Sequence, residues 1–254
     1  MKVKKSLLAA GIGMALIIAV ACTGNKTAQT SSIESGGAGK GTAPASKAAK
    51  QADVALVRFV NGTTTDKDLA FGDTTPFPGV GDRDVTAYKQ LPAERRDFKL
   101  YAKNDKTISL ATNSEGLSAG KHYTILAVNT KDGKTSLDPI SDSLTPPDAG
   151  KAKVRVINLA PRMENVDLYV EGKSSPIISG AGLDHPTDYK DVDPTNASLA
   201  VRHGMNKKNA AVIKDFRIES GKLYTVLVFQ DKGGKLKVKT VEDQFTAAPN
   251  GATS

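Results

Sequence analysis

The residue types that most often carry out chemistry in proteins are scarce in this chain. It has one cysteine, three histidines and no tryptophan among 254 residues. His122, His185 and His203 form neither His-x-x-x-His nor His-Glu-x-x-His, the spacings that bring two imidazoles to one metal ion. A hydrolase nucleophile motif, Gly-x-Ser-x-Gly, is also missing from the sequence. We therefore predict no metal site, no cofactor and no catalytic residue, and expect structural or surface roles for the histidines.

Three closely spaced aspartates, Asp188, Asp191 and Asp193, raise the question of calcium, because carboxylate oxygens are its preferred ligands. The common calcium-binding loop needs a glycine at its sixth position and a glutamate at its twelfth. Neither residue stands at those positions counted from Asp188 or from Asp191. A solvated turn is the better interpretation of this segment.

One polar, basic segment is a candidate binding loop. It runs from Arg202 to Asn209 between two apolar stretches and matches the segment 102–106 of an earlier, similar part of the chain. Binding often resides in loops carried by a rigid scaffold. The side chains expected to contribute are those of Arg202, His203, Lys207 and Lys208. The alternative is a solvated hairpin tip, since a small charge cluster is usually only a wet surface.

The N-terminus has the pattern of an export signal. Three lysines precede an apolar run from Leu7 to Ala21, which is too short to span a membrane. The sole cysteine, Cys22, follows at once, as in bacterial lipoprotein signals, where the cysteine is acylated and becomes the new N-terminus. We expect residues 1–21 to be a signal peptide and Cys22 to carry the acyl chains, palmitate among them, that anchor the protein to a membrane. Ordinary secretion with a chance cysteine is the alternative.

A tether follows the cysteine. Residues 22–52 are rich in Ser, Thr, Gly, Ala and Lys, a composition that cannot bury enough apolar surface to fold. This part of the chain also explains the basic charge: the net charge is +8, residues 1–52 contribute +6, and the remainder carries only +2. We therefore expect no nucleic-acid partner. Because Thr23 rather than aspartate follows Cys22, we expect the outer membrane of the cell envelope where the host has one.

The rest of the chain consists of two similar copies of one unit. The matches have offsets of 97 to 101 residues, which indicates a duplication with small insertions. The repeated segments are Val57–Asn61 with Val154–Asn158, Asp68-Leu69 with Asp167-Leu168, Tyr88-Lys89 with Tyr189-Lys190, and Gly120–Leu126 with Gly221–Leu227. A Pro/Gly stretch, residues 145–150, separates the copies. We predict two domains, 53–147 and 149–248.

Each copy has the alternation of β-strands. Apolar residues recur with a period of two over short runs that end at Gly or Pro, and Asp132-Gly133 and Gly233-Gly234 are typical of hairpin turns. About seven strands per copy predict an all-β protein with two tandem immunoglobulin-like antiparallel β-sandwich domains. Tyr123 and Tyr224 each follow a glycine turn at the start of a strand, as in a tyrosine corner, in which the hydroxyl bonds nearby backbone.

The second copy carries Val-Arg-Val-Ile-Asn-Leu-Ala-Pro (154–161), Val-Asp-Leu-Tyr-Val-Glu-Gly (166–172) and Gly-Lys-Leu-Tyr-Thr-Val (221–226). These segments resemble domain-of-unknown-function family 4397, and the resemblance extends in tandem over residues 53–245. The family occurs in exported bacterial proteins. Its pattern consists of core and turn residues, so the resemblance implies a fold and carries over no catalytic residue.

Together these features favour a lipid-anchored envelope protein whose sandwiches are a non-catalytic binding or scaffolding module. Its expected partners are the membrane, through acylated Cys22, and an envelope protein or polysaccharide. An envelope enzyme or a polysaccharide-binding accessory protein is the alternative, since fold alone does not decide function.

Overall fold

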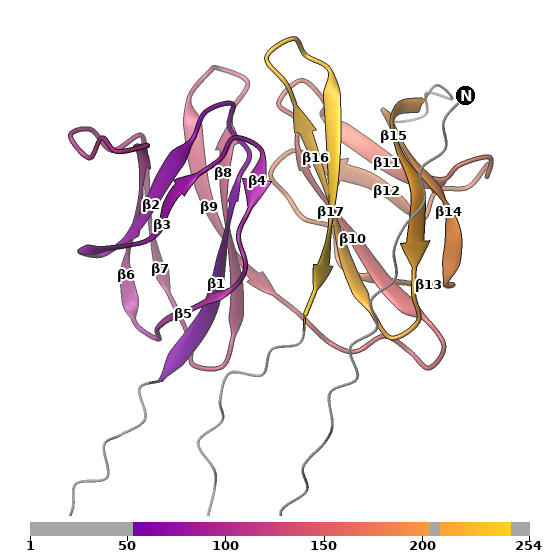
Figure 1. Ribbon diagram of the computed structural model, residues 1–254, viewed down its shortest axis with the longest axis horizontal. Coiled ribbons are helices and arrows are strands. Elements are labelled where there is room, and N and C mark those ends of the chain that lie inside the picture. Colours follow the sequence, from indigo (N-terminus) through magenta and orange to yellow (C-terminus); the bar gives the residue numbers. More distant parts are fainter. Residues whose placement is uncertain (1–52, 204–208, 245–254) are drawn as a thin grey trace, which may run out of the picture. The chain divides into compact units, whose positions relative to one another are not determined.

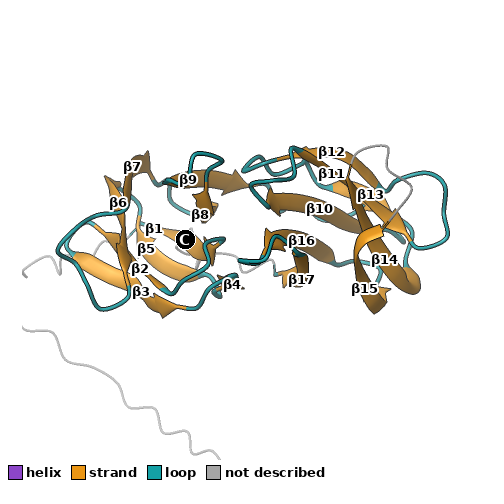
Figure 2. Cartoon of the chain, turned by 90° about the horizontal axis from the view of Figure 1, so that it is seen from above, coloured by secondary structure: helices purple, strands orange, loops and turns teal. Residues whose placement is uncertain are grey.

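A computed structural model describes residues 53–203 and 209–244. These residues form strands and loops without a helix (Figures 1 and 2). The predicted all-β class is therefore confirmed. Within the described residues, no helix has the length and apolar character needed to cross a bilayer.

The first sandwich has two sheets, with the strand orders β4-β1-β8-β9 and β3-β2-β6-β7, and β5 also pairs with β1. Its strands are β1 (Val54–Asn61), β2 (Lys67–Phe71), β3 (Thr74–Val80), β4 (Asp84–Val85), β5 (Lys89–Pro92), β6 (Arg95–Ala102), β7 (Ala111–Gly116), β8 (His122–Asn129) and β9 (Thr135–Asp142).

The second sandwich repeats this arrangement, with the strand orders β13-β10-β16-β17 and β12-β11-β14-β15. Its strands are β10 (Ala152–Leu159), β11 (Asn165–Val170), β12 (Ile178–Gly182), β13 (Lys190–Val192), β14 (Thr195–His203), β15 (Asn209–Ile218), β16 (Leu223–Gln230) and β17 (Leu236–Asp243). Apart from the additional short strand β4 of the first sandwich, equivalent strands have the same order in both copies, which supports the duplication found in the sequence. The predicted domain limits of 147 and 149 fall in the segment between β9 and β10 and remain a prediction.

One strand pair in each sandwich differs from the fully antiparallel arrangement expected from sequence. β1 pairs with β8 in parallel, and β10 pairs with β16 in parallel. Parallel neighbours need a long crossover between them. Here the segments from β2 to β7 and from β11 to β15, which include the whole second sheet of each sandwich, supply that connection.

The central strands β1, β8, β10 and β16 are buried on both faces. One face of each strand joins the core of its own sandwich: Ala55, Val57 and Phe59 of β1 belong to the first core, and Val154 and Val156 of β10 to the second. The opposite faces meet in a third cluster to which both sandwiches contribute. Its buried members are Val60, Leu126, Val128, Ile157, Leu159, Leu227 and Phe229. The two sandwiches therefore share apolar burial, and both lie within one compact unit.

A repeated asparagine at the end of β1 and β10 fixes the loop that follows. The Nδ2 of Asn61 donates to the carbonyl of Thr65 at 2.9 Å, and the Nδ2 of Asn158 donates to the carbonyl of Met163 at 2.8 Å. Both asparagines are fully buried, so these bonds satisfy polar groups that would otherwise be costly. The asparagine of the repeat is thus part of the architecture.

A repeated aspartate holds a glycine in each sandwich. Asp68 Oδ1 accepts from the backbone N–H of Gly79 at 2.5 Å, and Asp167 Oδ1 accepts from that of Gly180 at 2.8 Å. Both glycines have positive φ, at 59° and 68°, a conformation that other residues rarely adopt. The Asp-Leu repeat of the sequence is therefore a backbone clamp.

Both predicted tyrosine corners are confirmed. The hydroxyl of Tyr123 accepts from the backbone N–H of Ser118 at 3.1 Å, and that of Tyr224 accepts from Glu219 at 3.2 Å. Both rings are buried. The predicted hairpin turns at 132–133 and 233–234 are also present, joining β8 to β9 and β16 to β17.

We predict that Tyr224→Phe lowers the free energy of unfolding by about 1 kcal/mol, because the N–H of Glu219 loses its partner while the ring stays packed. Urea unfolding of the full chain measures the change. Tyr101→Phe is the matched control, since no hydrogen bond is found for the Tyr101 hydroxyl among the described residues. Equal stability of the two variants would show that the corner bond contributes nothing.

Candidate functional site

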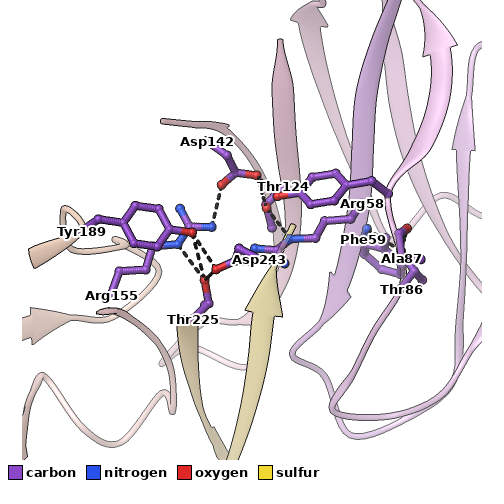
Figure 3. A network of polar contacts seen from close by, with 11 residues as sticks. Arg58, Phe59, Thr86, Ala87, Thr124, Asp142, Arg155, Tyr189, Thr225 and Asp243 are labelled. Carbon is purple, nitrogen blue, oxygen red and sulfur yellow. Dashed lines mark hydrogen bonds and ion pairs between the residues drawn. The ribbon is translucent and has the colours of Figure 1, made fainter. Parts of the chain in front are cut away.

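A cluster of buried charged groups lies where the two sandwiches meet (Figure 3). Arg58 of β1 reaches out of the first sandwich to Asp243 of β17, with Nη1 to Oδ1 at 2.6 Å. Its Nε donates to the hydroxyl of Thr124 on β8, in its own sandwich, at 2.8 Å. The side chains of Arg58 and Asp243 are 3% and 0% exposed, so this is a fully buried ion pair.

The second sandwich makes the equivalent contact to the first. Arg155 of β10 donates from Nη2 to Oδ1 of Asp142, on β9 of the first sandwich, at 2.7 Å. Its Nε donates to the hydroxyl of Thr225 at 2.9 Å. Each sandwich therefore supplies one guanidinium and one carboxylate, and both ion pairs cross the boundary between the sandwiches.

Each carboxylate is also held by two hydroxyls of its own sandwich. Asp142 accepts from Tyr88 at 2.8 Å and from Thr124 at 2.6 Å. Asp243 accepts from Tyr189 at 2.6 Å, and Thr225 donates to it at 2.5 Å. The tyrosine rings lie against the guanidinium groups of their own sandwich, at 4.8 Å for Arg58 and 4.6 Å for Arg155. We call these eight residues the cross-brace: Arg58, Tyr88, Thr124 and Asp142 from the first sandwich, and Arg155, Tyr189, Thr225 and Asp243 from the second.

The ionisation of the cross-brace follows from burial and from its pairing. Burial by itself would raise the pKa of Asp142, but the nearby guanidinium groups of Arg155 and Arg58 prevail and hold that pKa below its usual range. Burial would lower the pKa of Arg58, and Asp243 raises it above its ordinary value. Burial raises the pKa of Tyr88 and Tyr189 as well. The cross-brace contains two guanidinium and two carboxyl groups, so its formal charges sum to zero.

These contacts commit the reactive groups of the cross-brace to holding the sandwiches together. Each threonine hydroxyl accepts from an arginine and donates to an aspartate, and that aspartate is itself ion-paired with the arginine of the other sandwich. One nitrogen, Nη2 of Arg58, is buried without a hydrogen-bond partner among the described residues. The geometry is that of a structural clamp.

Sequence reasoning noted the arginines, tyrosines and threonines of the cross-brace as repeats but gave them no role. It missed Asp142 and Asp243 altogether. A signal was available, because these aspartates are 101 residues apart, the same offset as Tyr88 to Tyr189. That offset marked them as a further repeated pair.

The residues predicted from the sequence as a binding loop have different environments. Lys207 and Lys208 lie outside the described residues, as does the predicted lipidation site Cys22. Arg202 and His203 end β14. The guanidinium of Arg202 lies 4.0 Å from the centre of the Tyr169 ring, whereas His203 lines a groove between the sandwiches. Arg202 and His203, which were predicted to belong to one binding loop, therefore have different surroundings.

This junction groove has a volume of about 630 Å³. Its lining residues are Thr130, Lys131, Gly133, Pro161, Arg162, Glu164 and His203. Lys131 of the first sandwich pairs with Glu164 of the second at 2.5 Å, and both side chains are more than half exposed. Smaller grooves of about 350 and 420 Å³ border the cross-brace, the first beside Arg155 and the second beside Arg58.

The other candidate residues occupy structural or surface positions. His122 begins β8, and its ring lies edge-on to Tyr88 with 5.1 Å between centres. His185 is at the surface beside Asp184. Asp191 accepts from the backbone N–H of Asp148, and Asp193 pairs with Lys151 at 2.6 Å. In the described ranges, no three His, Cys, Asp or Glu side chains gather closely enough to hold a metal ion.

Fold and site together define a class: a tandem β-sandwich protein whose halves are cross-braced by buried ion pairs. A family model described as "Domain of unknown function (DUF4397)" matches residues 55–169, which confirms the predicted resemblance over that part of the chain. The match includes the four cross-brace residues of the first sandwich and Arg155 of the second.

Among solved structures, the chain is similar to a "putative cell adhesion protein" from Bacteroides uniformis ATCC 8492. The identity is 13%, the TM-score is 0.24, and the alignment covers 76% of this chain and 100% of the other. A search of proteins with curated functions returned no match.

We predict that Asp243→Asn lowers the free energy of unfolding by about 3–5 kcal/mol, because it leaves the buried charge of Arg58 without its counter-ion. Thermal and urea unfolding of the full chain measure the loss. Glu164→Gln is the control, since it breaks an exposed pair between the same two sandwiches, and such pairs contribute about 0–1 kcal/mol. Similar losses for the two variants would refute a special role for the buried pair.

We predict that the titration of Asp142 makes the free energy of unfolding depend on pH. Its folded-state pKa is lowered, so its contribution is complete above the ordinary aspartate pKa of about 3.9 and is lost as the pH falls through the lower folded value. We expect the free energy of unfolding to drop below about pH 4. The double variant Asp142→Asn with Arg155→Gln removes both charges and should flatten that drop. An unchanged pH profile in the double variant would contradict the assignment.

Proposed function

We propose that this chain is a lipid-anchored protein of the bacterial cell envelope, and that its paired sandwiches are a non-catalytic binding or scaffolding module. The observation that carries this proposal is the cross-brace. It fixes two sandwiches in one arrangement and thereby fixes the loops that border their junction. A rigid pair of domains that presents loops from both members suits recognition of a partner.

The chemistry of the buried polar groups supports binding rather than catalysis. Catalysis needs an acid, base or nucleophile free to exchange protons with a substrate. In the cross-brace, by contrast, every hydroxyl and carboxylate is engaged with another member of the set. Its tyrosines have raised pKa values that keep their protons in place.

The junction groove is the best candidate for the binding surface. Lys131 lines it from the first sandwich. Arg162 and His203 line it from two separate segments of the second sandwich. Only one acidic side chain, that of Glu164, lines it, and the exposed pairing of Glu164 with Lys131 is weak enough to be exchanged for a ligand. The side chain of Arg162 has no hydrogen bond or ion pair among the described residues.

This arrangement fits a partner that bears carboxylates. An arginine guanidinium binds a carboxylate through two parallel hydrogen bonds, and a lysine and a histidine nearby add positive potential. In the envelope, acidic polysaccharides and acidic protein segments both offer that chemistry. The proposed partner is therefore a carboxylate-bearing polymer of the envelope.

The envelope location rests on the sequence. The apolar run from Leu7 to Ala21 and the cysteine at its end have the pattern of a lipoprotein signal. An acylated cysteine carries more than one chain, which stable membrane anchoring requires. The segment up to residue 52 would then act as the tether between membrane and module.

We predict that the mature protein begins at Cys22 and carries acyl chains there. Intact mass spectrometry of protein extracted from bacterial membranes should give the mass of residues 22–254 plus lipid. Cys22→Ser should abolish both the cleavage and the added mass. A mature N-terminus elsewhere, or an unmodified Cys22, would rule out the anchor while leaving the binding hypothesis to be tested by itself.

We predict that the full chain binds a carboxylated polymer in the junction groove and that Arg162→Ala weakens binding about ten- to a hundredfold, since a hydrogen bond to a charged group contributes about 1.5–3 kcal/mol. Biolayer interferometry with immobilised polygalacturonate or poly-glutamate measures the effect, and the two polymers distinguish a glycan from an acidic protein. Binding should weaken as salt is added.

Lys173→Ala is the matched control for this experiment, because Lys173 is an exposed basic residue that does not line the groove. Equal effects of the two variants would indicate non-specific attraction and overturn the groove assignment. Binding to neither polymer at low salt would overturn the proposed partner chemistry.

A further inference from the structure

The contact between the two sandwiches has the reciprocity of a homodimer interface. Arg58 of the first sandwich meets Asp243 of the second, and Arg155 of the second meets Asp142 of the first. In a two-fold interface residue i of one partner contacts residue j of the other, and j contacts i in return. The duplicated halves reproduce this pattern within a single chain, with equivalent residues exchanging equivalent bonds.

The apolar part of the contact repeats in the same way. Val60, Leu126 and Val128 of the first sandwich correspond in the repeat to Ile157, Leu227 and Phe229 of the second, and all six are buried in the shared cluster. Each sandwich thus carries the whole set: one arginine, one aspartate and one apolar patch. Such a surface is complementary to any other surface of its kind.

The link between the sandwiches does not by itself determine which second sandwich is bound. β9 ends at Asp142 and β10 begins at Ala152, so nine residues connect them. Most of these residues are exposed, and two are prolines. The first sandwich of one chain and the second sandwich of another could form every bond of the cross-brace without a change in either sandwich.

We propose that a second copy of this chain is a partner for this surface, through an exchange in which the first sandwich of each chain binds the second sandwich of the other. The exchanged dimer has the same contacts as the closed monomer, made twice. The balance between the two forms is set by the linker and by chain concentration, because the intramolecular contact benefits from a high effective concentration. This inference goes beyond the proposed function and does not depend on the groove or on the lipid anchor.

The exposed ion pairs between the sandwiches make the exchange measurable. Lys131 pairs with Glu164, and Lys239 pairs with Asp84, each across the boundary between the sandwiches. Full chains carrying Cys22→Ser, one batch labelled with ¹⁵N and one unlabelled, are unfolded together in urea and refolded at high concentration. Monomer and dimer are separated by size, and a carbodiimide then joins each lysine to its carboxylate partner for mass spectrometry.

We expect a dimer fraction in which Lys131–Glu164 and Lys239–Asp84 crosslinks join labelled to unlabelled chains, and a monomer fraction in which they do not. A dimer fraction with only same-isotope crosslinks at these pairs would show association through another surface and overturn the proposal. Failure to form any dimer at millimolar concentration would also overturn it.

Complementary charge variants give an independent measurement. Arg58→Asp in one chain and Asp243→Arg in another each place like charges at the brace. In an exchanged dimer that contains one chain of each variant, opposite charges are paired at both interfaces. We expect each variant alone to lose thermal stability and the co-refolded mixture to regain it as a heterodimer. The control is one chain with both substitutions, which should regain stability without a partner variant because it again pairs opposite charges. If that control is stable and the mixture still shows no recovery, exchange does not occur.

Discussion

Two buried ion pairs, Arg58 with Asp243 and Arg155 with Asp142, are the interaction on which the arrangement of this molecule depends. A charge placed in a protein interior without a partner is so costly that the fold must supply one. Each sandwich places its arginine on a central strand where no acid of its own reaches the terminal nitrogens. The counter-ion comes from the other sandwich, and each pair therefore ties two otherwise separate cores to one another.

The remaining repeated polar residues serve the same end within each half. The buried asparagines close the loops after β1 and β10, the Asp-Leu aspartates hold glycines in an unusual backbone conformation, and the tyrosine corners secure the start of β8 and β16. What the duplication preserved is thus the scaffold. Two residues that line the junction groove, Arg162 and His203, lie where the two copies differ.

The fold was largely predictable because its signals are local. Alternating apolar residues, hairpin glycines and the repeated Gly-Lys-x-Tyr each act within a few residues, and they led to paired all-β sandwiches with tyrosine corners. The site was not predictable in the same way. Residues 54–60 have apolar side chains on both faces, but what covers the second face depends on packing between segments about 100 residues apart. The predicted loop contained His203 but not Lys131 or Arg162, which only the junction brings together.

The parallel pairing of β1 with β8 has a consequence for a protein under mechanical load. The chain enters the first sandwich at β1, and six residues of that strand, from Leu56 to Asn61, are in register with His122 to Ala127. Tension applied from the N-terminal side acts along β1, parallel to its neighbour and across the direction of the hydrogen bonds. The ladder is then loaded in shear, so its bonds must break together, whereas a terminal hairpin would unzip one bond at a time. If the module is held at its N-terminal end against flow or a moving partner, the pull acts in the direction in which the sheet resists force best.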